Sequence, residues 1–112
     1  MSSITSHVLD TAQGKPAAGI SVALHTQTEN GWQEVGRGVT NQEGRVADLL
    51  PVAGFKAGRY RLTFDTAGYQ VKTTIHPFFP EVTIIFDVRD ASQHYHVPLL
   101  LSPYGYSTYR GS

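Results

Sequence analysis

Short runs of alternating apolar and polar residues recur along this chain, and turn-forming residues separate them. The clearest runs are residues 4–10, 20–28 and 59–65. Successive side chains of a β-strand point to opposite faces, so this alternation is typical of strands with one buried face. Turn signals such as Asn30-Gly31 recur roughly every ten residues, which is the spacing of an all-β sandwich.

The pattern predicts about eight short strands. They fall at residues 4–10, 20–28, 32–40, 45–50, 59–65, 81–88, 94–101 and 106–109. One segment, residues 66–74, breaks the period of two and predicts a single short helix with Thr66 as its N-cap. The two prolines in residues 76–80 exclude a helix there.

The chain has 112 residues, which predicts one domain spanning residues 1–112. It has no cysteine, so disulfides and thiolate metal sites are excluded. Nine basic residues balance nine acidic ones. Nucleic acid is therefore not expected as a partner, whereas zero net charge favours self-association.

No apolar run is long enough to cross a membrane, so a membrane is not expected as a partner either. The first residues lack the basic and apolar regions of a signal peptide. A cytoplasmic location, in the compartment of synthesis, is the expectation.

Residues 94–112 are the chemically richest stretch. With a period of two, one face of the strand at 94–101 is a core face and the other carries His94, His96, Pro98 and Leu100. Ser102-Pro-Tyr-Gly105 then predicts a turn into a short returning strand. The His-bearing face is too apolar for a wetted sheet surface, so we expect another subunit to cover it, with His96 in a groove between subunits.

Three further features make up a candidate site. His7, Arg45 and His96 each lie on the side of their strand away from the clearest apolar positions. Taken singly, each is more typical of a solvated residue than of a catalyst. The pair His94-x-His96 raises a metal as an alternative, but a third ligand at suitable spacing is missing and no metal is expected. His25 and His76 are interpreted as structural or surface residues.

The chain resembles a known family at several motifs. They are Ser6-His7-Val-Leu-Asp10, Gly44-Arg45, Phe78-Phe-Pro-Glu-Val82 and Leu100-Leu-Ser-Pro-Tyr-Gly-Tyr-Ser-Thr-Tyr-Arg-Gly-Ser112. These motifs resemble the 5-hydroxyisourate hydrolases, the transthyretin-related enzymes of purine catabolism. The ending Tyr109-Arg-Gly-Ser112 is the most specific of them, because the hormone carrier transthyretin diverges there.

The resemblance implies a transthyretin-like (prealbumin-like) sandwich of two four-stranded sheets with one short helix. It also implies a homotetramer, a dimer of dimers, with active sites in the channel between dimers. The implied reaction converts 5-hydroxyisourate, the product of urate oxidation, to 2-oxo-4-hydroxy-4-carboxy-5-ureidoimidazoline without a metal or organic cofactor. The implied site consists of His7, Arg45, His96 and Ser112, shaped by Tyr109, Arg110 and Gly111.

The chemistry of these side chains supports a hydrolytic hypothesis. An imidazole titrates near neutral pH, so His7 and His96 are expected to share the positioning and deprotonation of a water, and which one is the base stays open. Arg45 is expected to hold the substrate carbonyl and its developing charge. Ser112 is expected to hydrogen-bond the water, a histidine or the ring, through its hydroxyl or its carboxylate.

The sequence leaves three alternatives open. A covalent seryl intermediate is a competing mechanism, although a nucleophilic serine is usually held on a rigid turn. A transthyretin-like carrier of a small aromatic ligand is the main rival function, and a purely structural β-sandwich is the second.

Overall fold

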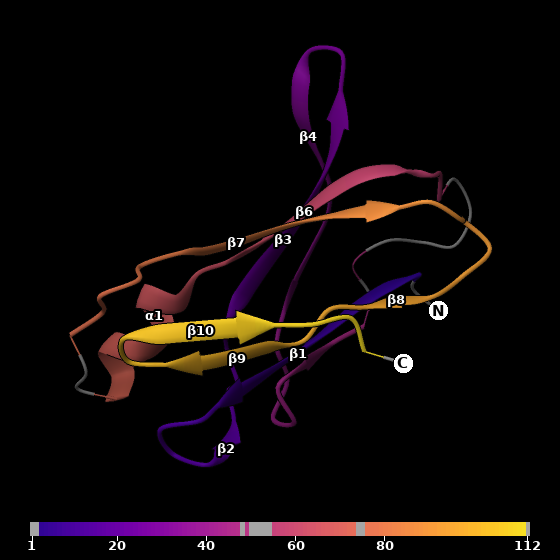
Figure 1. Ribbon diagram of the computed structural model, residues 1–112. Helices are drawn as coiled ribbons and strands as arrows, with labels where there is room; N and C mark the ends of the chain where they lie inside the picture. Colours follow the sequence, from indigo (N-terminus) through magenta and orange to yellow (C-terminus); the bar gives the residue numbers. More distant parts are fainter. Residues whose placement is uncertain (1–2, 48, 50–54, 74–75, 112) are drawn as a thin grey trace.

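The computed structural model describes residues 3–47, 49, 55–73 and 76–111. They form a sandwich of two sheets, with one short α-helix at one end, where the chain passes between two strands of the same sheet (Figure 1). This confirms the all-β sandwich predicted from the alternating pattern. None of the described helices is long and apolar enough to cross a membrane.

One sheet has four antiparallel strands in the order β4-β3-β6-β7. Their bounds are β3 Ser21–Thr28, β4 Gly31–Val39, β6 Gly58–Phe64 and β7 Val82–Val88. The tight β3–β4 connection is possible because Gly31 has φ +112°, a conformation that favours glycine. The β3–β4 hairpin extends beyond the rest of the sandwich, as the purple strands at the top of Figure 1 show.

The second sheet is assembled around β1, Ile4–Asp10. On one edge β1 pairs in parallel with β8, Tyr95–His96, and β9, Leu99–Ser102. On the other edge it pairs antiparallel with β5, Arg45–Val46, and β2, Lys15–Pro16. The strand β10, Gly105–Thr108, pairs with β9. Along one edge β8 and β9 lie in line, and along the other β5 and β2 do. The sheet is therefore four strands wide, as implied, with two of its four strands interrupted.

Two predicted strands differ in extent from the observed ones. The strand predicted at 94–101 is interrupted between β8 and β9, because Pro98 has no N–H to donate to a neighbouring strand. The strand predicted at 45–50 ends at Val46. Leu49 is buried but lies outside the strand, and residues 48 and 50 lie outside the described residues.

The core fills the space between the two sheets. In β1 the even-numbered residues are buried, whereas Thr5, His7 and Leu9 are half-buried on the outer face. The largest completely buried side chains are Ile4, Val8, Ile20, Val22, Leu24, Leu62, Phe64, Val82 and Leu99. Burial of one face therefore directs the polar residues of β1 to the opposite face, outside the sandwich.

The helix is shorter than predicted and its cap differs. The helix α1 spans Thr66–Gln70 and continues as the 3₁₀ turn η1, Val71–Thr73, while residue 74 lies outside the described residues. Its N-cap is Asp65, whose Oδ1 accepts a hydrogen bond from the Gly68 N–H at 3.1 Å. The prediction of Thr66 as the cap was wrong, because the Thr66 side chain is completely buried and donates to the Phe79 carbonyl instead.

A buried carboxylate joins this helix to β1. Asp10 accepts hydrogen bonds from the N–H groups of Ala12 and Gln13 through Oδ1, and from the Tyr69 hydroxyl through Oδ2 at 2.7 Å. Burial, with the hydrogen bond and charge of Asp10, raises the pKa of Tyr69 to about 12. The Tyr69 phenol therefore remains protonated, and a hydrogen-bond donor, at neutral pH.

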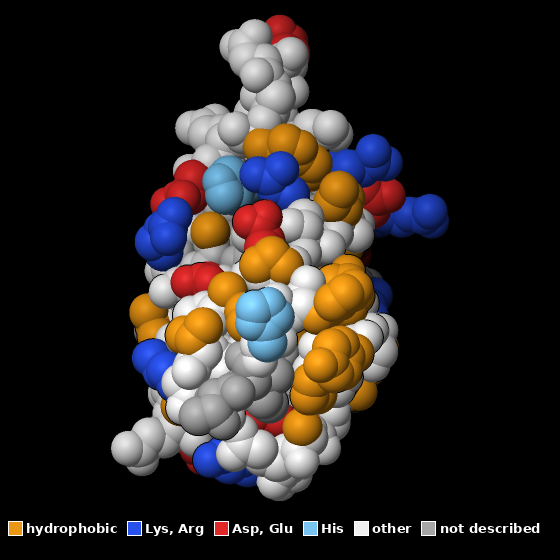
Figure 2. Space-filling view, turned by 90° about the vertical axis from the view of Figure 1, so that its left-hand side faces the viewer, with side chains coloured by type: hydrophobic (Ala, Val, Ile, Leu, Met, Phe, Trp, Pro, Cys, Tyr) orange, Lys and Arg blue, Asp and Glu red, His pale blue; other side chains and the backbone are white. Residues whose placement is uncertain are grey.

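Aromatic side chains gather on the surface at the end of the sandwich where the β9–β10 turn lies, the end that faces the viewer in Figure 2. Phe78 stacks edge-on against Phe79, and each also contacts a tyrosine, Tyr104 or Tyr106. These contacts tie the segment before β7 to the β9–β10 hairpin. The motif Phe78-Phe-Pro-Glu-Val82 therefore has a packing role, at the end of the sandwich opposite to β8 (Figure 1).

Replacing Tyr69 by Phe is expected to lower the free energy of unfolding by about 1.5–3 kcal/mol, because the buried Asp10 carboxylate loses a donor. Urea denaturation at pH 7 measures this change. The matched control is Tyr104→Phe, whose ring is 74% exposed.

The same contact has a pH dependence with a defined sign. The pKa of Tyr69 is higher in the folded state than its ordinary value of 10. Its stabilising contribution is thus complete below pH 10 and is lost as the pH rises towards about 12. Tyr69→Phe should remove this part of the alkaline destabilisation, and an unchanged alkaline profile in the variant would contradict it.

Candidate active site

The pairing of β1 with β5 brings His7 and Arg45 together. The two residues are directly opposite each other in the antiparallel register. The turn before β5 fixes this arrangement, since the Asn41 side chain accepts hydrogen bonds from the N–H groups of Glu43 and Arg45. Gly44 has φ +77°, and a Cβ there would lie 2.4 Å from the Val8 carbonyl oxygen. A larger residue at position 44 would therefore push β5 away from β1, so glycine is needed there to keep Arg45 next to β1.

The other edge of β1 brings in His96. In the parallel register Thr5 is opposite His96, and Thr5 and His7 point to the same outer face of β1. The structure therefore gathers His7, Arg45 and His96 on one face, as the sequence pattern suggested. These residues come from the start, the middle and the end of the chain.

Hydrogen bonds orient both imidazoles. The His7 Nε2 lies 2.8 Å from the Glu43 carbonyl oxygen, which can only accept, so Nε2 carries a proton and Nδ1 is left as the acceptor of the neutral ring. The His96 Nδ1 lies 2.8 Å from the Thr5 hydroxyl. No other described residue hydrogen-bonds the His96 ring, which leaves its Nε2 available to a ligand.

The surroundings of His96 favour its neutral form. Burial lowers the pKa of His96 below its ordinary value of 6.5, and the positive charges of Arg45, His7 and His94 lower it further. At neutral pH the His96 imidazole is therefore uncharged, with one ring nitrogen protonated and a lone pair on the other.

The C-terminal residues close against His96. The Gly111 N–H donates to the His96 carbonyl at 2.8 Å, and a Cβ at position 111 would lie 2.7 Å from Cδ2 of the His96 ring. Only glycine therefore fits at position 111 without displacing that ring.

Tyr109 and Arg110 border a hollow that includes His94 but is not lined by His7, Arg45 or His96. Its volume is about 630 Å³, and its lining consists of Gln93, His94, Tyr109, Arg110 and Gly111. The Arg110 guanidinium donates to the Gln93 side chain at 2.9 Å and lies 4.5 Å from the centre of the Tyr95 ring. Tyr109 is 56% exposed, and Ser112, the remaining predicted site residue, lies outside the described residues.

The arrangement suits acid–base chemistry on a small polar molecule. Two imidazoles, each with one nitrogen occupied by a protein partner, lie beside a guanidinium for which the described residues supply no carboxylate. Across the described ranges, no three His, Asp or Glu side chains lie close enough to hold a metal ion. The alternative of a metal at His94 and His96 therefore gains no third ligand from this part of the chain.

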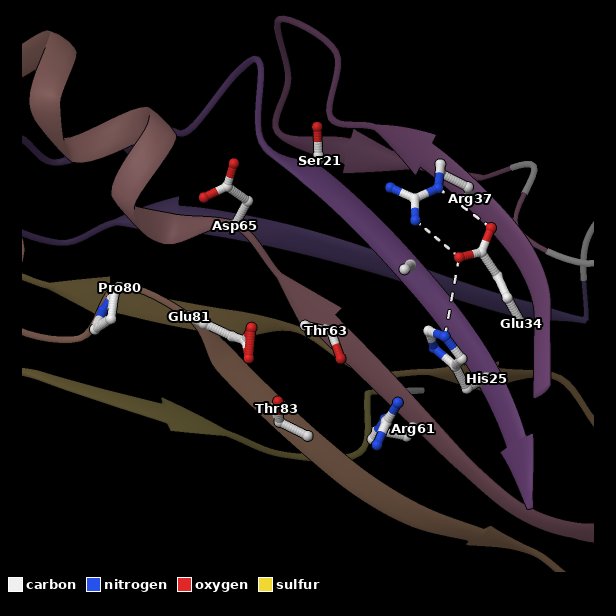
Figure 3. Close-up of a pocket in the computed structure, with 11 residues that line it drawn as sticks. Ser21, His25, Glu34, Arg37, Arg61, Thr63, Asp65, Pro80, Glu81 and Thr83 are labelled. Carbon is white, nitrogen blue, oxygen red and sulfur yellow. Dashed lines mark hydrogen bonds and ion pairs between the residues drawn. The ribbon is translucent and has the colours of Figure 1, made fainter. Parts of the chain in front are cut away.

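A second polar groove, of about 490 Å³, lies on the outer face of the other sheet and does not contain the predicted site residues (Figure 3). Glu34 lies between Arg37 and His25 there, with two hydrogen bonds to Arg37 and a 3.9 Å contact to His25. His25, which we interpreted as structural or surface from the sequence, is thus half-buried and paired. Its groove carries charges of both signs along an open sheet face.

Sequence reasoning missed two parts of the site. The Thr5 hydroxyl was not singled out, although it lies two residues before His7 on the same face. The Glu43 carbonyl was also missed, because backbone acceptors leave no signal in residue types. The position of Thr5 on the His7 face was a usable signal, whereas its pairing with His96 depends on a long-range parallel register.

Comparison with known proteins gives a consistent result. Residues 4–111 match the family described as the HIUase/Transthyretin family. The chain is 46% identical over 106 residues to a 5-hydroxyisourate hydrolase of Salmonella dublin, covering 95% of this chain and 78% of that protein.

Solved structures agree. The fold matches that of Klebsiella pneumoniae 5-hydroxyisourate hydrolase with a TM-score of 0.86 and 36% identity, over 100% of both chains. It also matches sea bream transthyretin in complex with thyroxine, with a TM-score of 0.92 and 31% identity over 98% of this chain and 95% of that one. The chain therefore belongs to the HIUase/transthyretin family.

Proposed function

We propose that this protein hydrolyses 5-hydroxyisourate, opening a ring amide of that heterocycle during urate degradation. The observation that carries the proposal is the convergence of His7, Arg45 and His96 on one sheet face beside the C-terminal residues. The 46% identity to a 5-hydroxyisourate hydrolase identifies the substrate to which this site is matched.

Hydrolysis of a ring amide begins with a water that must lose a proton as it attacks the carbonyl carbon. His96 is neutral at working pH, because its pKa is lowered, and its Nε2 is free of protein partners among the described residues. We assign it the role of general base. His7, whose Nδ1 is the free acceptor, holds the water from the other side.

The attack creates negative charge on the carbonyl oxygen. A guanidinium group is a permanent cation in proteins, and Arg45 is held opposite His7 by the β1–β5 register. It is the group available to bind that oxygen and to stabilise the developing charge. The proton taken by an imidazole can then pass to the leaving ring nitrogen, which completes ring opening.

The C-terminal residues provide the border of the substrate site in this proposal. Gly111 leaves the His96 ring uncovered, and Arg110 is anchored to Gln93 and Tyr95 at the rim of the hollow. Tyr109 is exposed and available to contact the ring substituents of the substrate. The Arg110 guanidinium packs on Tyr95, on the opposite face of the sheet from His96, and so holds the C-terminal residues in place. The predicted role of Ser112, and the competing seryl intermediate with it, stay predictions.

A carrier function is the alternative, because the fold also matches a transthyretin bound to thyroxine. A carrier needs no general base and no unpaired guanidinium next to it. Within the described residues, the present chain offers a neutral imidazole for the first role and a guanidinium without a carboxylate partner for the second. Its identity to the hydrolase also exceeds its identity to that transthyretin, at 46% against 31%.

We also propose that the protein acts as a homotetramer with its sites between dimers, and that it resides in the cytoplasm. The edge strands β7 and β10 lie on one side of the sandwich and jointly line a pocket of about 260 Å³. Open edges with exposed apolar residues such as Ile85 and Tyr109 favour association with another chain. The outer face of the β1 sheet, with Leu9 and Leu100, supports the second contact.

His96→Ala and His7→Ala are expected to lower kcat/KM by roughly 100-fold or more, because each removes an acid–base group. The assay follows the ultraviolet absorbance of 5-hydroxyisourate freshly generated by urate oxidase. His25→Ala, in the groove of the other sheet, is the matched control and should retain activity. Near-normal rates in both site variants would exclude the assignment.

Arg45→Met is expected to raise the pKa of His96, because a nearby positive charge that disfavours the imidazolium is removed. An NMR titration of the ring protons measures the pKa without any need for activity. Arg59→Met is the matched control, since Arg59 pairs with Asp87 in the other sheet. An unchanged or lowered pKa of His96 in the Arg45 variant would contradict the arrangement.

Sedimentation should give a mass near four times the 12.3 kDa of the chain. If the site lies between subunits, specific activity should fall when the protein is diluted into the range where the assembly dissociates. A monomer that keeps full specific activity would be incompatible with a site of this kind.

A further inference from the structure

A single hydroxyl group lies between two imidazoles at the edge of the active site. The Thr5 Oγ1 is 2.8 Å from Nδ1 of His96 and 3.0 Å from Nε2 of His94. The parallel β1–β8 register holds Thr5 opposite His96, and His94 reaches the same hydroxyl from two residues earlier in the chain. The two histidines are therefore connected through one oxygen atom.

The number of protons in this group restricts its arrangements. A threonine hydroxyl has one proton, so it can donate to one imidazole nitrogen and must accept from the other. In the first arrangement Thr5 donates to His94, and Nδ1–H of His96 donates to Thr5. In the second, Nε2–H of His94 donates to Thr5, and Thr5 donates to Nδ1 of His96.

The two arrangements differ at the catalytic nitrogen. In the first, neutral His96 carries its proton on Nδ1, so Nε2 has the free lone pair that a general base requires. In the second, neutral His96 carries its proton on Nε2 and cannot take one from water there. The direction in which the Thr5 hydroxyl points therefore decides whether His96 can act as the base.

We propose that Thr5 is a positioning residue that couples the tautomer of His96 to the protonation state of His94. A protonated His94 has a hydrogen on both ring nitrogens and can only donate to Thr5. Thr5 must then donate to His96, which places the His96 proton on Nε2. Protonation of His94 thus switches off the base without any movement of the backbone, a role that rests on the proposed hydrolase function.

Several titratable or charged groups surround Thr5, His94 and His96. His96 faces Arg45 of β5 and His7 of β1, and His94 shares its hollow with Tyr109 and Arg110. Protonation of His96 itself also contributes to any acidic loss of activity. The coupling is therefore distinguished by how many protons must bind to inactivate the enzyme, compared between the unmodified protein and its variants.

The hydroxyl is tested with two substitutions at position 5. Thr5→Ser keeps the hydroxyl and should retain the rate and pH profile of the unmodified protein. Thr5→Val has nearly the same shape without the hydroxyl and should lower kcat about tenfold or more, with a smaller effect on KM. Equal kcat values in the Val and Ser variants would overturn the proposal.

The coupling is tested with His94→Gln, which cannot take up a proton. The limiting slope of log kcat/KM against pH on the acidic side equals the number of inhibitory protons. In this variant it should be smaller by one than in the unmodified protein, because one inhibitory protonation is removed. His25→Gln is the matched control and should leave the slope unchanged. A His94→Gln variant with the original slope would overturn the coupling.

The tautomer is read independently of catalysis by ¹⁵N NMR of the imidazole nitrogens in the substrate-free protein. At neutral pH the unmodified protein should have the His96 proton on Nδ1, and the proton should shift to Nε2 as His94 becomes protonated. A His96 proton on Nε2 throughout would overturn the proposal even if the protein is an active hydrolase. Conversely, the expected shift in an inactive protein would leave the coupling intact and contradict only the proposed function.

Discussion

The site depends on the pairing of one strand, β1, along both of its edges. Its antiparallel contact with β5 brings Arg45 to His7, and its parallel contact with β8 brings His96 to Thr5. Core burial of Ile4 and its even-numbered neighbours fixes the register, since a slip of one residue would turn His7 into the core. The same hydrophobic alternation that stabilises the sandwich therefore also selects which side chains lie on the face of the candidate site.

Local alternation was sufficient to predict the face on which the candidate site residues lie. His7, Arg45 and His96 each lie on the polar side of a strand, and the structure brings all three together. What the sequence could not supply was the partner of each side chain. The contacts of Thr5 with His94 and His96 span about 90 positions in the chain and depend on parallel pairing, for which single-sequence patterns carry no signal.

The fold shows the same contrast: features set by local sequence were predicted, and features set by long-range contacts were not. Alternation located most strands, but Pro98 divides one of them, and Asp65 rather than Thr66 caps the helix. Aspartate and threonine are both common N-cap residues, so propensity does not choose between Asp65 and Thr66. The choice between them depends on the buried bond from Thr66 to the Phe79 carbonyl, a tertiary contact that local sequence does not reveal. Ser112 lies outside the described residues, so its predicted role stays a prediction.

A carrier and a hydrolase can share this fold because the core and the site use opposite faces of the same sheet. Residues that stabilise the sandwich point inward from β1, and the candidate site residues point outward. The outer face can therefore change chemistry without any change in packing. Catalysis, unlike binding, also requires control over which nitrogen of an imidazole carries the proton. The backbone carbonyl at Glu43 and the hydroxyl of Thr5 each constrain one imidazole in this way, and a site that only binds its ligand would gain nothing from that constraint.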